Sequence, residues 1–368
     1  MGEGDRREPR HRGADGSQRM AIRHWRSLRR KVATARTRKH AAVVALFLLV
    51  PTACTAPSHG ASGIGAGIHE IRACGAPREV TPTSLAAAMA DDGCANLALA
   101  PGDYGAIEAR DRSGGVLTLR CAEPGACTIG SESSISDSDG VIVDGARFQG
   151  GNIALTITGS SNVLVRRSSF IEQTATGVLV APRPASDNIQ ITENEFRNGS
   201  RGCQRNNRDN CSGALRDGTP VASMDYGVRV YAASTIEISR NSFSSLFNHA
   251  ISLKHSTGLA TIVENRFDGC GRICIQLGQE PNTVPSGDRS VASAVVARNT
   301  LQGDALQGIL VQNIEKADIT DNVIRISGRP IQVPDEYGKC SKGTGGCPLL
   351  GSGFPAERTV IRRDNTVN

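Results

Sequence analysis

The chain has 368 residues, with 42 Lys and Arg against 36 Asp and Glu. At 21% charged and 39% hydrophobic residues, the composition excludes a disordered chain and an integral membrane protein. The first 54 residues hold 13 of the basic and 4 of the acidic residues, so the remainder has 29 basic against 32 acidic residues. A slightly acidic body argues against a nucleic-acid binder. Because the single Trp, Trp25, also lies in this first part, an extensive aromatic platform for stacking sugars is excluded.

Residues 1–54 have the order of parts found in a signal peptide. A basic region, with nine Lys and Arg at positions 19–39, precedes an apolar run at 41–50. Ten apolar residues are too few to span a bilayer and match the core of a signal peptide. The basic region is unusually long, so the chain could start at Met20 instead of Met1. A cytosolic protein with a basic tail is the alternative.

The end of this leader is Pro51-Thr-Ala-Cys54. Small residues before a cysteine resemble a bacterial lipobox, which predicts cleavage before Cys54, lipidation of Cys54 and a cell-envelope lipoprotein on the outer membrane or cell surface. Because Pro51 stands where Leu is usual, ordinary secretion is the alternative.

The remaining ten cysteines fall in neighbouring pairs, as expected for an exported chain with disulfides. The expected pairs are Cys74 with Cys94, Cys121 with Cys127, Cys203 with Cys211, Cys270 with Cys274, and Cys340 with Cys347. Short loops favour these sequential pairings, although the sequence leaves the connectivity open. No spacing is CxxC and no nearby His completes a ligand set, so a zinc site is not expected.

Residues 55–72 are rich in Gly, Ala, Ser and Pro at their start and are expected to form a flexible tether. The folded domain is then 73–368. Near its beginning, 83–90 is typical of a short helix, and 95–104 alternates like a strand that ends in a turn.

The rest of the chain is a repeat of about 23 residues, made of short alternating strands without helices. The repeated segments end at Phe148, Phe170, Phe196, Phe243, Phe267, Leu301, Ile324 and Val367. Six of them carry Asn two residues earlier: Asn194, Asn241, Asn265, Asn299, Asn322 and Asn365. This pattern predicts an all-β, right-handed, single-stranded parallel β-helix with a short N-terminal cap helix. The asparagines are expected to form an internal ladder at one corner.

Three segments interrupt the repeat, at 197–223, about 279–293 and 335–357. Long excursions from a rigid solenoid commonly form the walls of a binding groove. Three of the cysteine pairs are expected to staple loops near such a groove. They are Cys203 with Cys211, Cys270 with Cys274, and Cys340 with Cys347.

A second strand follows each repeated segment, and its outward positions form two columns. The first column is expected to hold Leu179, Arg229, Ser252, Cys274, Leu310 and Gln332. The second is expected to hold Ala181, Tyr231, Lys254, Gln276 and Gln312. Coils about 4.8 Å apart would bring the polar members together in one strip.

Two histidines support the polar strip as a candidate site. His249 and His255, the only two in the predicted solenoid, stand on either side of the Lys254 strand. Tyr226 belongs to the preceding coil. A surface cluster of Lys, Arg, His and Tyr suits an anionic sugar chain. The alternative is the solvated polar face of a structural solenoid.

Two stretches resemble the alginate lyase and chondroitinase B group of polysaccharide lyases. VTPTSLAAAMADDG with LALAPGDY resembles that group's cap and first strand, and NHAISLKHSTGLATIVENRFDGCGRICIQLG resembles its central I-S-x-K strand and N-x-F corner. The resemblance covers most of residues 75–330. In that family a Lys abstracts the proton alpha to a uronate carboxylate, an Arg one coil later assists, and acidic residues bind calcium.

The resemblance assigns the base to Lys254. The Arg position is Gln276, and the calcium-ligand positions are Phe247 and His249, so two of the three elements are missing. Calcium is therefore implied only by the resemblance, and no other cofactor or metal is expected. Either another set performs the elimination, or the chemistry has been lost. The candidate catalytic residues are Lys254, His249, His255 and Tyr231, and the candidate substrate-binding residues are Arg229, Tyr226, Gln276 and Gln312.

The leading hypothesis is an exported, lipid-anchored, monomeric β-helix that engages an acidic polysaccharide and, if it is an enzyme, cleaves it by β-elimination. The alternative is a non-catalytic envelope protein that binds carbohydrate or has a structural role. Hydrolysis would need paired carboxylates at a suitable separation. Asp225 and Glu237 lie near the strip but do not form such a pair in the sequence pattern.

Overall fold

The computed structural model describes residues 71–90, 92–198, 224–254, 257–278, 291–312, 314–332 and 359–367. All of them belong to one compact unit of residues 63–368. Within these ranges, no helix is long and apolar enough to cross a membrane.

Several predicted residues lie outside the described ranges. They are the lipidation site Cys54, the candidate catalytic residue His255, and the four cysteines of two predicted disulfides, Cys203 with Cys211 and Cys340 with Cys347. These two disulfides therefore stay predictions, as does their place near a groove.

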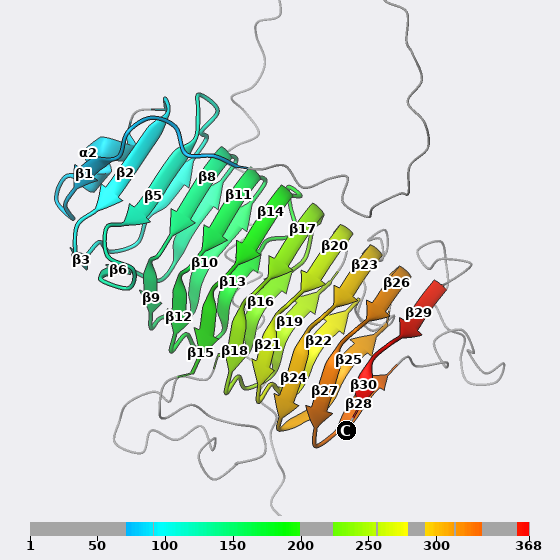
Figure 1. Ribbon diagram of the computed structural model, residues 1–368. Helices are drawn as coiled ribbons and strands as arrows, with labels where there is room; N and C mark the ends of the chain where they lie inside the picture. Colours follow the sequence, from blue (N-terminus) through cyan, green and yellow to red (C-terminus); the bar gives the residue numbers. More distant parts are fainter. Residues whose placement is uncertain are drawn as a thin grey trace, which may run out of the picture. The chain divides into compact units, whose positions relative to one another are not determined.

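Each coil contributes one short strand to each of three parallel sheets, and each new coil adds a strand beside the previous one (Figure 1). Sheet A comprises β1 (Arg78–Val80), β2 (Ala95–Leu99), β5 (Leu117–Cys121), β8 (Asp139–Asp144), β11 (Ser161–Arg166), β14 (Asp187–Thr192), β17 (Ala233–Ser239), β20 (Thr257–Val263), β23 (Val291–Ala297), β26 (Ile314–Thr320) and β29 (Thr359–Arg363).

Sheet B is built from shorter strands. It comprises β3 (Gly102–Asp103), β6 (Cys127–Ile129), β9 (Arg147–Gln149), β12 (Ser169–Ile171), β15 (Glu195–Arg197), β18 (Ser242–Ser244), β21 (Arg266–Asp268), β24 (Thr300–Gly303), β27 (Val323–Ile326) and β30 (Thr366–Val367).

Sheet C comprises β4 (Glu108–Arg110), β7 (Ser133–Ser136), β10 (Ile153–Thr158), β13 (Thr176–Val180), β16 (Tyr226–Val230), β19 (His249–Leu253), β22 (Gly271–Leu277), β25 (Ala305–Val311) and β28 (Arg329–Gln332). This arrangement confirms the right-handed parallel β-helix.

The core is a set of stacked columns, because equivalent residues of successive coils lie one above another. The sheet B phenylalanines form the largest column, with neighbouring ring centroids between 4.7 and 5.0 Å apart. Its members are Phe148, Phe170, Phe196, Phe243 and Phe267, all essentially without exposed surface. Offset stacking of this kind adds to the stabilisation from burial alone.

The predicted asparagine ladder is confirmed at the corner between sheets A and B. The Nδ2 of Asn241 donates to the Oδ1 of Asn265 at 3.0 Å, and the backbone N–H of Asn241 donates to the same oxygen at 2.9 Å. The bond repeats from Asn194 through Asn365. Each amide satisfies backbone groups that the corner would otherwise bury unpaired.

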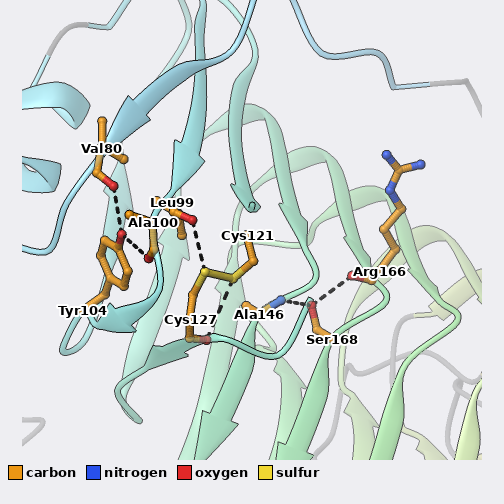
Figure 2. The surroundings of a disulfide bond; sticks show 9 residues. All are labelled: Val80, Leu99, Ala100, Tyr104, Cys121, Cys127, Ala146, Arg166 and Ser168. Atoms are coloured by element: carbon orange, nitrogen blue, oxygen red, sulfur yellow. Dashed lines mark hydrogen bonds between the residues drawn. A yellow bond between two sulfur atoms is a disulfide. The ribbon is translucent and has the colours of Figure 1, made fainter. Parts of the chain in front are cut away.

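The N-terminal end is closed by α2 (Leu85–Met89), which buries Leu85 against the first coil and confirms the cap helix (Figure 1). Two of the predicted disulfides, Cys74–Cys94 and Cys121–Cys127, hold this end together. Figure 2 shows the second, which joins β5 to β6. Nearby, the Tyr104 hydroxyl lies 2.7 Å from the Ala100 carbonyl oxygen and 2.9 Å from that of Val80.

The third described disulfide, Cys270–Cys274, has the predicted partners but not the predicted place. Both residues have no exposed surface and belong to the core, so the bond does not staple the wall of a groove. Cys274 belongs to an inward column of small residues at the start of the sheet C strands. Its members are Gly177, Gly227, Ala250, Cys274 and Gly308. A Cβ on Gly227 would lie 2.8 Å from the Phe243 ring, so at this position the phenylalanine column leaves no room for a side chain.

Candidate functional site

The candidate site lies on the outer face of sheet C, over four consecutive strands, β16, β19, β22 and β25. We call it the polar cluster. It consists of Tyr226, Arg229, Tyr231, His249, Ser252, Lys254, Gln276 and Gln312. The side chains face outward because their neighbours along each strand, such as Val228 and Val230, point into the core.

The outward columns differ from the predicted ones at β22. The register pairs Ile251 with Ile275 and Ser252 with Gln276. Gln276 therefore lies in the column of Arg229 rather than that of Lys254, and the prediction that Cys274 faces outward is wrong. From β10 to β25, each strand of this sheet contains two consecutive inward residues, which on β22 are Cys274 and Ile275, whereas simple alternation takes Ile273 and Ile275 as the inward pair.

Arg229 is held by aromatic rings. Its guanidinium carbon lies 4.3 Å from the ring centroid of Tyr226 and 4.8 Å from that of Tyr231. A delocalised, weakly hydrated guanidinium is well suited to this position over ring faces. Its buried Nε has no hydrogen-bond partner among the described residues, and no described carboxylate lies within ion-pair distance of Arg229. Arg229 is thus positioned by packing, with donors left for an anion.

Two titratable groups beside Arg229 are perturbed. Burial raises the pKa of the Tyr231 phenol, the positive charge of Arg229 opposes this, and Tyr226 adds to it. Burial also raises the pKa of the Asp225 carboxyl, again opposed by Arg229. The Tyr231 phenol therefore keeps its proton to a higher pH than an exposed tyrosine.

Lys254 begins a chain of side-chain hydrogen bonds that crosses three coils. Its Nζ donates to the Oε1 of Gln276 at 3.0 Å, and the Oγ of Ser252 donates to the same oxygen at 2.9 Å. The Nε2 of Gln276 in turn donates to the Oε1 of Gln312 at 2.8 Å. All four side chains are nearly buried, so these bonds fix both glutamine amides in one orientation.

His249 lies at the other end of β19 from Lys254. Its ring stacks on Tyr226, with centroids 5.1 Å apart and planes 1° from parallel. Its backbone N–H donates to the Asp225 carbonyl oxygen at 2.7 Å. Lys254 lies five positions further along the chain, roughly 16 Å away at 3.3 Å per residue. At that separation the two side chains do not meet at one reacting atom, and the described ring contact of His249 is with Tyr226.

The calcium implied by the family resemblance does not fit the residues present. Calcium takes carboxylate and carbonyl oxygens, whereas the expected positions hold a phenyl ring, Phe247, and the stacked imidazole of His249. No group of three His, Cys, Asp or Glu side chains that could hold a metal occurs in the described parts of the chain. No step is therefore derived through calcium.

The structure brings Arg229, Tyr226, Tyr231, Lys254, Gln276 and Gln312 together on one face of sheet C, with Gln276 in the column of Arg229 instead of that of Lys254. Ser252 in the polar cluster and Asp225 beside it were not assigned a role from the sequence. Ser252 fixes the Gln276 amide by its hydrogen bond, and the sequence feature that could have indicated this role is the outward position of Ser252 on the Lys254 strand. Asp225 lies next to Tyr226, and only the three-dimensional environment shows that its carboxyl is perturbed.

Comparisons with known proteins place this geometry in context. The profile of a family described as "Periplasmic copper-binding protein (NosD)" matches residues 121–284. Among solved structures, the PL6 family alginate lyase AlyGC is similar, with a TM-score of 0.52 and 14% identity. The match covers 82% of this chain and 41% of AlyGC, so the chain spans well under half of that enzyme.

Two further structures are similar at lower scores. An arginine-to-alanine mutant of AlyGC gives a TM-score of 0.43 at 13% identity, covering 83% of this chain and 41% of that one. An alginate lyase from Paenibacillus sp. str. FPU-7 gives 0.38 at 15% identity, covering 70% and 98%. No curated protein matches the sequence. The comparisons confirm, at the level of fold, the resemblance to β-helix polysaccharide lyases.

Proposed function

We propose that the protein engages an acidic polysaccharide on the outer face of sheet C and cleaves it by β-elimination. The observation that carries this proposal is the pairing of two cationic side chains on adjacent coils. Arg229 is fixed over two tyrosine rings, and Lys254 occupies the position beside Tyr231 on the next coil. The fold similarity to AlyGC, a polysaccharide lyase by its name, supports the same class of substrate.

Arg229 supplies the carboxylate subsite. A guanidinium can donate two parallel hydrogen bonds to the carboxylate of a uronate. The negative charge that develops on that carboxylate during proton abstraction is then stabilised by a group that is already oriented. Arg229 thus takes the part that a metal ion plays in a metal-dependent elimination, from the coil before Lys254.

The proton transfers fall to Lys254 and Tyr231. In its neutral form, the Lys254 amine takes the proton alpha to the carboxylate, a carbon–carbon double bond forms, and the bond to the leaving sugar oxygen breaks. The Tyr231 phenol gives its proton to that oxygen, since burial keeps the phenol protonated. Proton exchange with solvent returns both groups to their starting forms.

Export supports a polysaccharide as substrate. The sequence pattern of residues 1–54 is that of a signal peptide, and the matching family profile is described as periplasmic. Three disulfides in the described residues are consistent with an oxidising compartment. We propose in addition that Cys54 is lipidated after cleavage. Mass analysis of the mature N-terminus tests this, and an unmodified start at another residue would contradict it.

Product release from uronate-containing polymers tests the enzymatic proposal. The absorbance of the unsaturated product should rise with wild-type protein, with or without calcium. Lys254→Met should lower the rate by about 10²–10⁴-fold, the range for loss of a positioned proton-transfer group. Lys316→Met is a matched control, because Lys316 is an exposed lysine on sheet A, away from the polar cluster. Full activity in Lys254→Met would refute the assignment.

A non-catalytic binding protein is the second candidate. It is favoured by one observation, that the position of the family's assisting Arg is Gln276, whose amide is tied to Gln312. Saturable binding of an acidic polysaccharide by wild-type protein, without any unsaturated product, would establish this reading instead. The copper named in the matching family finds no described ligand group here, so no copper chemistry is proposed.

A further inference from the structure

In the two central columns of the outer face of sheet C, between β7 and β28, basic side chains occur on two coils only. Because the register is continuous from β7 to β28, the residues in line with Arg229 can be read directly. They are Ser134, Thr156, Leu179, Arg229, Ser252, Gln276, Leu310 and Gln332. In this column Arg229 is the one charged side chain, with three neutral positions before it and four after it.

The neighbouring column gives the same result. By the same register it holds Ser136, Thr158, Ala181, Tyr231, Lys254, Gly278 and Gln312. Lys254 is its one charged member, on the coil after Arg229. Other described cations lie on this face outside that stretch of the two columns. Arg110 on β4 pairs with Glu108 at 3.3 Å, Arg272 at the start of β22 is in line with Asp225, and Arg329 at the start of β28 is in line with Tyr226 and His249.

Coil spacing makes this distribution informative about the ligand. Successive coils lie about 4.8 Å apart, close to the length of one sugar residue in an extended chain. A polyuronate lying along the sheet would therefore place a carboxylate near almost every coil. Within these two columns, between β7 and β28, only the coils of Arg229 and Lys254 offer a basic side chain to receive one.

The neutral positions discriminate against a second carboxylate. Charge-assisted hydrogen bonds are about twice as strong as neutral ones, and a carboxylate that loses water without gaining a cation is penalised. The amides of Gln276 and Gln312, fixed by their own hydrogen bonds, are instead suited to hydroxyl or acetamido groups. Leu179 and Leu310 are suited to the apolar face of a sugar ring.

We infer that the preferred ligand is a heteropolysaccharide in which each acidic residue stands between neutral sugars, rather than a polyuronate. This inference rests on the proposed function, since it assigns the ligand of the same cation pair. It specifies one acidic subsite over β16 and β19, with neutral subsites over β10 and β13 on one side and over β22 and β25 on the other.

The test compares polymers at equal carboxylate concentration, using the full-length mature protein and a calorimetric or fluorescence binding assay. Gellan, whose repeat holds one glucuronate among neutral sugars, and hyaluronan, which alternates uronate with N-acetylhexosamine, represent the expected class. Polymannuronate, polyguluronate and polygalacturonate represent polyuronates. We expect gellan or hyaluronan to bind at least about tenfold more tightly than any polyuronate.

Leu179→Arg sharpens the test, because it adds a cation in line with Arg229 on the preceding coil at a half-buried outward position. It should improve polyuronate affinity several-fold relative to gellan. Thr261→Arg, an equal charge change on an outward position of sheet A, should leave the ratio unchanged. Wild-type protein that prefers a polyuronate would overturn the inference and leave the proposed function standing. Failure to bind any of the five polymers would overturn both.

Discussion

Arginines gather in two places on this solenoid, and the two places are organised in opposite ways. On sheet A, the Asp144 carboxylate accepts from Arg120 at 3.2 Å, from Arg166 at 3.0 Å, and also from Arg167. On sheet C, Arg229 lies against tyrosine rings, with no described carboxylate in ion-pair distance. The Asp144 side chain is only 2% exposed, so the sheet A group is internally compensated.

The comparison separates a structural ion network from a binding site. Burial works to raise the pKa of Asp144, but the hydrogen bond and charge of Arg167 and the charge of Arg166 outweigh it, and the pKa falls below its ordinary value. The sheet A arginines thus have their anion within the fold. Arg229 has a fixed position without a comparable anion, which is the arrangement expected where the anion comes from a ligand.

The largest effect is expected on the free energy of unfolding, when the ion network around Asp144 on sheet A is disrupted. Asp144→Asn removes a buried charge from between three guanidinium groups and should lower the free energy of unfolding by about 2–4 kcal/mol. This range is below that for a fully buried ion pair, because solvent screens the partly exposed arginines. Arg229→Ala should change it by less than about 1 kcal/mol, since Arg229 has no comparable ion pair. Denaturant unfolding of both variants measures this. Equal losses of unfolding free energy in the two variants would contradict the distinction between a structural ion network on sheet A and a binding site on sheet C.

A smaller effect is expected from Arg229→Lys, which keeps the charge and loses the planar guanidinium. Without that plane, the side chain cannot make bidentate contact with a carboxylate while lying over Tyr226 and Tyr231. Polysaccharide affinity should fall by about tenfold, nearly as far as in Arg229→Ala. A lysine variant that binds like wild type would mean that Arg229 contributes only a net charge.

The fold was predictable because its signals recur. Asn265 and Asn299 each stand two residues before the last apolar residue of their segments, and one amide can bond the next only if coils stack in register. The outward position of Arg229, Tyr231 and Lys254 followed from alternation on short strands. These features depend on local pattern and on a repeat length, both of which the sequence shows directly.

Two features escaped prediction for physical reasons. On β22 the two consecutive inward residues are Cys274 and Ile275, whereas alternation takes Ile273 and Ile275 as inward, and this places Gln276 two residues away from its register in the structure. The Asp144 group was also missed. Its signal was present, since Asp144 and Arg166 occupy the same place in VIVDGARF and VLVRRSSF, and equivalent places of adjacent coils are neighbours.

The smallest expected effect concerns acid. Because the folded-state pKa of Asp144 lies below its ordinary value of 3.8, its stabilising contribution is fully present above that value and is lost as the pH falls through the folded-state value. The melting temperature of wild-type protein should therefore drop more steeply below about pH 4 than that of Asp144→Asn. Parallel profiles for the two proteins would show that Asp144 is not held in its charged form.

The most direct measurement of the central claim is the affinity for an acidic polysaccharide of two matched variants, Arg229→Ala on sheet C and Arg120→Ala on sheet A. Each removes one arginine from an outward face of the same solenoid. The account predicts that Arg229→Ala weakens binding by about tenfold or more while Arg120→Ala stays within about twofold of wild type. Equal weakening in both, or loss only in Arg120→Ala, would contradict the assignment of the binding site to sheet C.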